Sequence, residues 1–164
     1  MDLSLLLERT IEREYPNLAA VTEEQAGVHP AGQDSWSPKQ ELGHLIDSAA
    51  NNHMRFVRAA LEPEYHGPGY AQNDWVELHG YQEMPWQSIA DFWFRYNRFL
   101  AHLIAQIPES RMKALCSIGS AARVTLAFLI EDYVLHMQHH VDHMLKRDRI
   151  TAYPSAPAQP KSET

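Results

Sequence analysis

The chain has 164 residues, a single cysteine and a formal net charge of -7 at pH 7. This length suits one domain with a substantial core, and the acidic balance, without a predicted basic face, excludes the usual nucleic-acid and membrane-surface binding proteins. Cys116 has no partner for an internal disulfide, which fits a reducing compartment, and its small Ser/Gly surroundings give no reason to expect a catalytic thiol.

The chain ends and the hydropathy suggest a cytoplasmic protein. No apolar run approaches the roughly 20 residues of a membrane-spanning helix, and residues 1–7 lack the basic start and apolar core of a secretory signal. We expect one folded domain over residues 1–150. The remaining segment, 151–164, is rich in Pro, Ala and Ser and is expected to be disordered.

The first half of the chain contains two helical patterns. Apolar residues at helical spacing predict an amphipathic helix over about 2–25, which Pro16 should kink or interrupt. Glycine and proline then mark a loop over 27–35. The following Ser-Pro-Lys-Gln segment has an N-cap serine, a proline at the first helical position and a capping-box glutamine. A second helix is therefore predicted over 38–61.

The second half predicts two more helices after an unusually long connection. Prolines and glycines punctuate residues 62–85, with a short helical stretch at 74–79. Connections of this length are usually functional or cross a bundle. Helices are then predicted over 86–107 and over about 121–147. The apolar face of 86–107, which we interpret as core, comprises Ile89, Phe92, Trp93, Tyr96, Phe99, Leu100, Leu103, Ile104 and Ile107. The pattern predicts an all-α four-helix bundle with a long connection between helices 2 and 3.

The last helix carries four of the ten histidines within eight residues: His136, His139, His140 and His143. Helical phase places His136 and His140 on the apolar stripe, and two imidazoles one turn apart can hold one divalent ion. His139 and His143 are rotated toward the side of Asp132, and we interpret them as a hydrated flank. The apolar stripe comprises Leu126, Leu129, Tyr133, Met137 and Met144.

A third ligand is sought on the second helix, which offers two histidines. His53 lies on its apolar face, whereas His44 lies opposite, in a polar stripe with Ser48, Asn51 and Arg55. Periodicity alone makes His53 the inward candidate and His44 a surface residue. A polar stripe can equally line a hydrated cleft inside a bundle, so the phase of the helix leaves both histidines open.

Several segments between residues 36 and 147 form a recognisable set. They are WSPKQELGHLIDS at 36–48, then Asn51, Arg55 and Phe56, YAQNDW at 70–75, and YVLH with a histidine pair at 133–140. Together they resemble the DinB/YfiT-like superfamily. The resemblance implies a four-helix bundle of up-down-down-up topology and a metal site formed by His44, His136 and His140. His53 then becomes a core or boundary histidine.

The same resemblance implies a divalent ion, often nickel or zinc, and a small-molecule substrate such as a low-molecular-weight thiol. Members of this superfamily include thiol S-transferases and proteins without known activity, and a homodimer is plausible from it. Two classes stay open: a metal-dependent transferase or hydrolase, and a non-catalytic bundle that holds an ion for stability or sensing. A di-iron carboxylate site needs two Glu-x-x-His motifs, and the chain has only Glu41 to His44 at that spacing.

Three polar residues are candidates for work beside the ion. Asp132, one turn before His136, could orient a ligand imidazole or a substrate, although a solvated helix charge is an equal alternative. Asn51 and Arg55 could bind a substrate carboxylate or make ordinary interhelical contacts. Residues 72–75 of the long connection could form a lid, although loop packing also explains Trp75.

Overall fold

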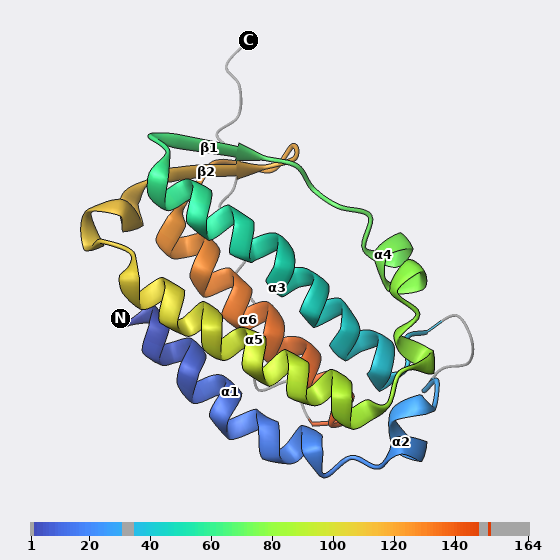
Figure 1. Ribbon diagram of the computed structural model, residues 1–164. Coiled ribbons are helices and arrows are strands. Elements are labelled where there is room, and N and C mark those ends of the chain that lie inside the picture. Colours follow the sequence, from blue (N-terminus) through green and yellow to red (C-terminus); the bar gives the residue numbers. More distant parts are fainter. Residues whose placement is uncertain (1, 31–34, 148–150, 152–164) are drawn as a thin grey trace.

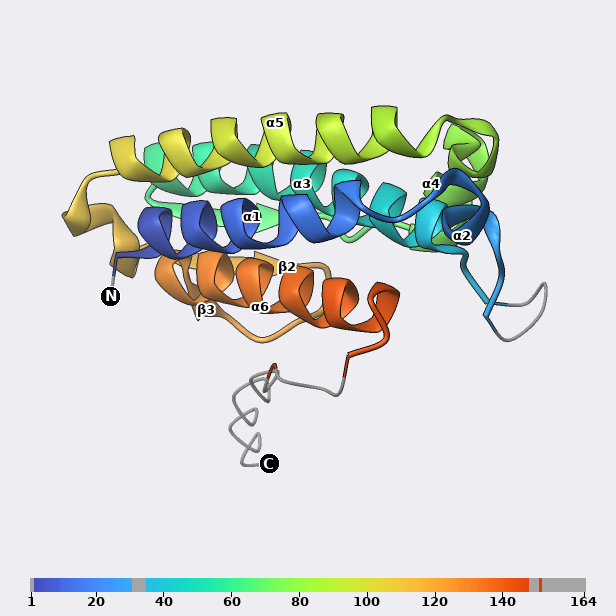
Figure 2. The same ribbon diagram turned by 90° about the horizontal axis from the view of Figure 1, so that it is seen from below.

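The computed structural model describes residues 2–30, 35–147 and 151, and it shows a four-helix bundle (Figure 1). The long helices are α1 (Leu3–Ala19), α3 (Pro38–Leu61), α5 (Trp86–Gln106) and α6 (Leu126–Met144). α1 and α3 each pack against both α5 and α6 (Figure 2). The predicted four-helix bundle is confirmed. The segment predicted to be disordered, 151–164, lies outside the described residues apart from Thr151.

Helical phase correctly places the core side chains of α6. The predicted stripe of Leu126, Leu129, Tyr133, Met137 and Met144 is buried.

None of the described helices is long and apolar enough to cross a membrane.

The apolar face predicted for α5 is only partly buried. Ile89, Trp93 and Leu100 are enclosed, but Phe92 and Phe99 are 53% and 49% exposed. These two rings lie at the edge of the apolar face and are covered only in part. The inclusion of both rings in the predicted core is therefore wrong.

The first predicted helix is two helices. α1 ends at Ala19, and a short helix α2 (Glu23–Gly27) begins after Thr22. The Thr22 hydroxyl accepts the backbone N–H of Gln25, and the Gln25 side chain accepts the backbone N–H of Thr22. This capping box satisfies backbone donors that a continuous helix would not leave free, so a single helix over 2–25 is a wrong prediction.

The start of α3 follows from its sequence. Ser37 accepts the backbone N–H of Gln40, the Gln40 side chain accepts that of Ser37, and Pro38 is the first helical residue. The predicted bounds, 38–61, agree with the observed ones. At the other end, the Arg111 guanidinium donates to the backbone oxygens of Ala59, Ala60 and Glu62. Carbonyl groups at the end of a helix have no N–H partner within it.

A small sheet, absent from the all-α prediction, joins the two long connections at one end of the bundle. β1 (Glu64–Gly67) pairs in parallel with β2 (Leu115–Ile118), and β2 pairs antiparallel with β3 (Val124–Thr125). Cys116 lies buried in β2 rather than in a loop, and burial raises the pKa of its thiol. Because β3 occupies 124–125, α6 begins at Leu126 instead of near residue 121.

The connection between α3 and α5 runs back along the bundle (Figure 1). After β1 it contains α4 (Gln72–His79), which is two residues longer at its start than predicted, and the 3-10 turn η1 (Tyr81–Glu83); a second such turn, η2 (Glu109–Lys113), follows α5. Gly80 ends α4 in the left-handed conformation at φ 63°, where glycine avoids a steric penalty. The connection thus covers a face of α3 that would otherwise meet solvent.

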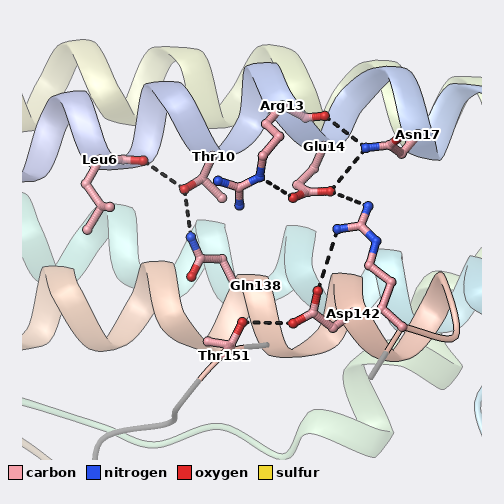
Figure 3. Close-up of polar contacts among 9 residues, drawn as sticks. Leu6, Thr10, Arg13, Glu14, Asn17, Gln138, Asp142 and Thr151 are labelled. Carbon is pink, nitrogen blue, oxygen red and sulfur yellow. Dashed lines mark hydrogen bonds and ion pairs between the residues drawn. The ribbon is translucent and has the colours of Figure 1, made fainter. Parts of the chain in front are cut away.

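Charged side chains, two of them buried carboxylates, tie α1 to the end of α6, as Figure 3 shows. Glu14, 2% exposed, accepts from Arg13 and from Arg147, and Arg147 also lies 3.6 Å from Asp142. Burial alone would raise the pKa of the Glu14 carboxyl, but the two arginines together lower it. The contact fixes the C-terminal end of the helix that carries the histidine cluster.

Candidate metal centre

Three histidines converge between α3 and α6. The Nε2 atom of His136 lies 3.3 Å from that of His44 and 3.1 Å from that of His140. One ring nitrogen of each residue lies within 4.8 Å of the others, which is the arrangement of a group that could hold a metal ion. The spacing of His136 and His140 on one helix, and the packing of α3 against α6, bring these nitrogens together.

Burial keeps two of these imidazoles neutral. His44 is 1% exposed, and burial, followed by repulsion from His140, lowers its pKa to about 4. Burial, with added repulsion from His140 and His44, lowers the pKa of His136 to about 3. Neutral imidazole is the form that binds metal. The donor set therefore fits a divalent cation at pH 7.

His44 is buried because the long connection covers the polar stripe of α3. Asp47, one turn after His44, accepts from the Tyr81 hydroxyl at 2.7 Å and lies 2.9 Å from His79 Nδ1. Trp36 packs on the other side, with its ring centroid 4.9 Å from that of His44. The surface position that periodicity alone predicted for His44 is wrong, since a helix can be covered on two faces.

His53, the inward candidate by phase, lies away from the cluster. Its side chain is half-buried between α3 and α5, with Nδ1 3.1 Å from the Tyr96 hydroxyl and its ring 5.3 Å from that of Phe99. The structure therefore places it at the boundary of the core, and the periodicity argument for an inward ligand is wrong.

Glu41 is the residue that the sequence reasoning missed. Its carboxylate is buried, with Oε1 2.8 Å from His140 Nδ1, and both its oxygens lie 2.9 Å from His143 Nδ1. His143 has a 63% exposed side chain, as expected of a flank residue, yet it contacts this carboxylate. The signal in the sequence is the spacing of Glu41 and His44, which are three residues apart and hence on one face of the helix.

The other candidates lie around this group. Asp132 is half-buried one turn before His136, and burial raises the pKa of its carboxyl. The ring of His139 is 5.4 Å from that of His140. The Asn51 amide donates to the backbone oxygen of Asp47.

Arg55 holds the connection against α3. It donates to the backbone oxygen of Pro68 and to the side chain of Asn52, and burial lowers its pKa. Trp75 of α4 packs against Tyr70 and His79. These contacts account for both residues without a ligand.

Two adjoining cavities lie beside Glu41, and the first of them reaches His140. The first, of about 500 Å³, is lined by Ser35, Trp36, Glu41, His139, His140, His143 and Arg147. The second, of about 730 Å³, has a more apolar wall that includes Val21, Val28 and Met144, and it shares Glu41, His143 and Arg147 with the first. Space for a small molecule therefore lies directly against His140.

Comparison with known proteins places this chain in a family. The sequence model of the DinB superfamily matches residues 6–144. YfiT from Bacillus subtilis, described as "a probable metal-dependent hydrolase with an unusual four-helix bundle topology", has a similar structure at a TM-score of 0.78 and 20% sequence identity, covering 88% of this chain and 82% of that one. No curated protein matches the sequence significantly. With the family model matching most of its length, the chain belongs to the DinB superfamily.

Proposed function

We propose that the chain is a metal-dependent enzyme that holds one divalent ion through His44, His136 and His140. The observation that carries this proposal is the convergence of three imidazole nitrogens within 4.8 Å, with no fourth His, Cys, Asp or Glu joining the group among the described residues. Catalytic sites typically combine three protein ligands with an open position, whereas structural zinc sites are closed by four. The open position favours chemistry over a purely structural ion.

The reaction class that fits is attack by a small nucleophile on a small-molecule substrate. When bound, the ion would lower the pKa of water or of a thiol and so supply a nucleophile near neutral pH. Water would make the chain a hydrolase, the activity named for the related YfiT, and a low-molecular-weight thiol would make it an S-transferase. Nickel and zinc both suit imidazole ligands. The cavity of about 500 Å³ beside His140 has room for such a substrate.

Around the ion, the side chains of the chain have separate tasks. Trp36 and the long connection exclude water from one side of His44. Asp132, whose pKa burial raises, is our candidate for holding a proton near the substrate. Arg55 donates to the backbone oxygen of Pro68, and we assign it to holding the connection on α3, whereas Asn51 donates to Asp47 within α3 itself.

We also propose that two chains pair as a homodimer. The half-exposed rings of Phe92 and Phe99 on α5 give such a contact an apolar surface. Sedimentation velocity at micromolar concentration measures the state, and a monomer at every concentration would contradict the proposal.

Metal analysis of matched variants tests the site. The purified parent protein is expected to carry about one equivalent of nickel or zinc after loading, and His136→Ala and His44→Ala are expected to lose it. His53→Ala is the control, because His53 faces Tyr96 instead of the cluster, and it should keep the metal. Undiminished metal in His136→Ala would refute the site.

Activity assays then separate the chemistry from simple ion holding. A panel of esters and amides, and a panel of thiols with an electrophile, are compared with added zinc or nickel and after chelation. Turnover that disappears in His136→Ala supports the enzyme. An absence of turnover in both panels, together with a cobalt spectrum that does not change on thiol addition, would favour the non-catalytic alternative.

A further inference from the structure

The buried carboxylate of Glu41 lies between two imidazoles of α6. It is 4% exposed, and its described ion-pair partners are His140 and His143. A buried carboxylate needs such partners to offset its loss of hydration. Glu41 and His44 both come from α3, while His140 and His143 both come from α6, so the contact links the two helices beside the metal cluster.

We propose that Glu41 is a positioning residue of the metal centre, which fixes the tautomer and the orientation of His140. This inference rests on the proposed metal site. An ionised carboxylate can only accept hydrogen bonds, so the short contact of 2.8 Å places the proton of His140 on Nδ1. With the proton of this contact on Nδ1, Nε2 is the nitrogen left to bind an ion, and it is the atom that lies 3.1 Å from His136 Nε2.

His143 holds Glu41 in this orientation. Its Nδ1–H donates at 2.9 Å to both oxygens of the carboxylate, so that the Glu41 side chain is held from the solvent side while His140 holds it from the cluster side. The His143 side chain is 63% exposed, and water can replace part of its contact. Loss of His143 should therefore weaken the centre less than loss of Glu41.

His44 has no such contact. The Nδ1 atom of His44 is buried without a hydrogen-bond partner among the described residues, so no matching carboxylate orients that ring. Polar partners of ligand histidines typically change metal affinity by about 10- to 100-fold when removed. The binding strength of His140 therefore depends on the carboxylate of Glu41.

Metal affinity measured by chelator competition tests the inference. Glu41→Gln keeps the size of the side chain but loses the charge and one acceptor oxygen, and it should weaken zinc or cobalt binding by about 10- to 100-fold. His143→Gln, at an exposed position, should weaken it by less than Glu41→Gln. Glu64→Gln is the matched control, since this carboxylate also contacts a histidine, His66, but in β1 instead of at the cluster, and the variant should bind the metal within about twofold of the parent.

Two further readouts separate positioning from a general loss of structure. Thermal unfolding of the metal-free variants measures folding. A long-range ¹H–¹⁵N spectrum of the metal-free parent should show His140 with its proton on Nδ1, and Glu41→Gln should change this pattern together with the visible spectrum of bound cobalt.

The possible results distinguish the two proposals. Parent-like affinity and an unchanged cobalt spectrum in a folded Glu41→Gln variant overturn the role of Glu41 and leave the metal site standing. A parent protein that binds neither zinc, nickel nor cobalt overturns both. If Glu41→Gln fails to fold, the ¹H–¹⁵N spectrum of the metal-free parent decides, and a His140 ring with its proton on Nε2 then overturns the inference.

Discussion

Gly43 is the position at which a single methyl group should do most harm next to the metal centre. It precedes His44 in α3, and the ring of Tyr81 lies directly on it. A Cβ atom built at Gly43 would lie 2.1 Å from Tyr81 Cδ2 and 2.3 Å from Cγ, far inside the separation of about 3.5–4.0 Å at which carbon atoms attract. Gly43→Ala must therefore displace the ring by more than about 1 Å.

The cost follows from what the ring holds. The Tyr81 hydroxyl donates to buried Asp47 at 2.7 Å, and loss of a hydrogen bond to a charged group costs about 1.5–3 kcal/mol. Overpacking adds about 1–3 kcal/mol, while alanine returns about 1 kcal/mol of helix propensity. The net destabilisation is about 2–5 kcal/mol. For a chain of this size, the expected fall in Tm is about 10 °C.

Thermal and urea unfolding of the metal-free protein measure this effect. Gly27→Ala is the control, because the nearest atom to its Cβ, Gln82 Nε2, lies at an ordinary 3.8 Å, and its stability should change by less than about 0.5 kcal/mol. In a Tyr81→Ala background the cost of Gly43→Ala should largely disappear. A Gly43→Ala protein as stable as the parent, or the same cost in both backgrounds, would refute the reasoning.

Three further results are expected. Glu14→Gln should destabilise the protein by about 2 kcal/mol at pH 7, because it leaves Arg147 with a weakened partner; since the pKa of Glu14 is lowered in the folded state, the difference should shrink as the pH falls through that pKa, which urea titrations at pH 7 and pH 3 would check. Metal-free protein should lose stability as the pH falls below about 6.5. Burial lowers the pKa of His44 to about 4 and that of His136 to about 3, so in this pH range the unfolded chain binds protons that the folded chain does not. An equally steep loss of stability in His136→Ala would count against this cause. Arg111→Met should cost about 2 kcal/mol by removing donors from the last carbonyl groups of α3, and no change in the urea midpoint would contradict it.

Much of the fold was predictable because its signals are local. Ser37, Pro38 and Gln40 determine the start of α3 through backbone groups within a few residues. The apolar stripe of α6 and the pair of His136 and His140 follow from the helical repeat alone. The prediction of one helix over 2–25 failed at the same local level, since the capping box of Thr22 starts a separate helix and competes with a continuous one.

The sheet and the fate of the α3 histidines depend on contacts between distant segments. β1 and β2 pair although 51 positions separate Tyr65 from Cys116. Each strand has only four residues, too few for a recognisable strand pattern in the sequence. From periodicity alone, the polar stripe with His44 is predicted to face solvent. In the structure the connection at 62–85 covers it through the contact of Tyr81 with Asp47.

The amino-acid order by itself therefore gives the four helices, the phase of α6 and one pair of imidazoles on a single helix, because these depend on the regular repeat of the backbone. The complete cluster needed the packing of α3 against α6, which sets His44 beside His136 and Glu41 beside His140. Helical phase tells which residues of one helix share a face. Only the packed chain shows that α3 is covered on two faces. His44 and Glu41 are therefore both buried, although they do not lie on the apolar face.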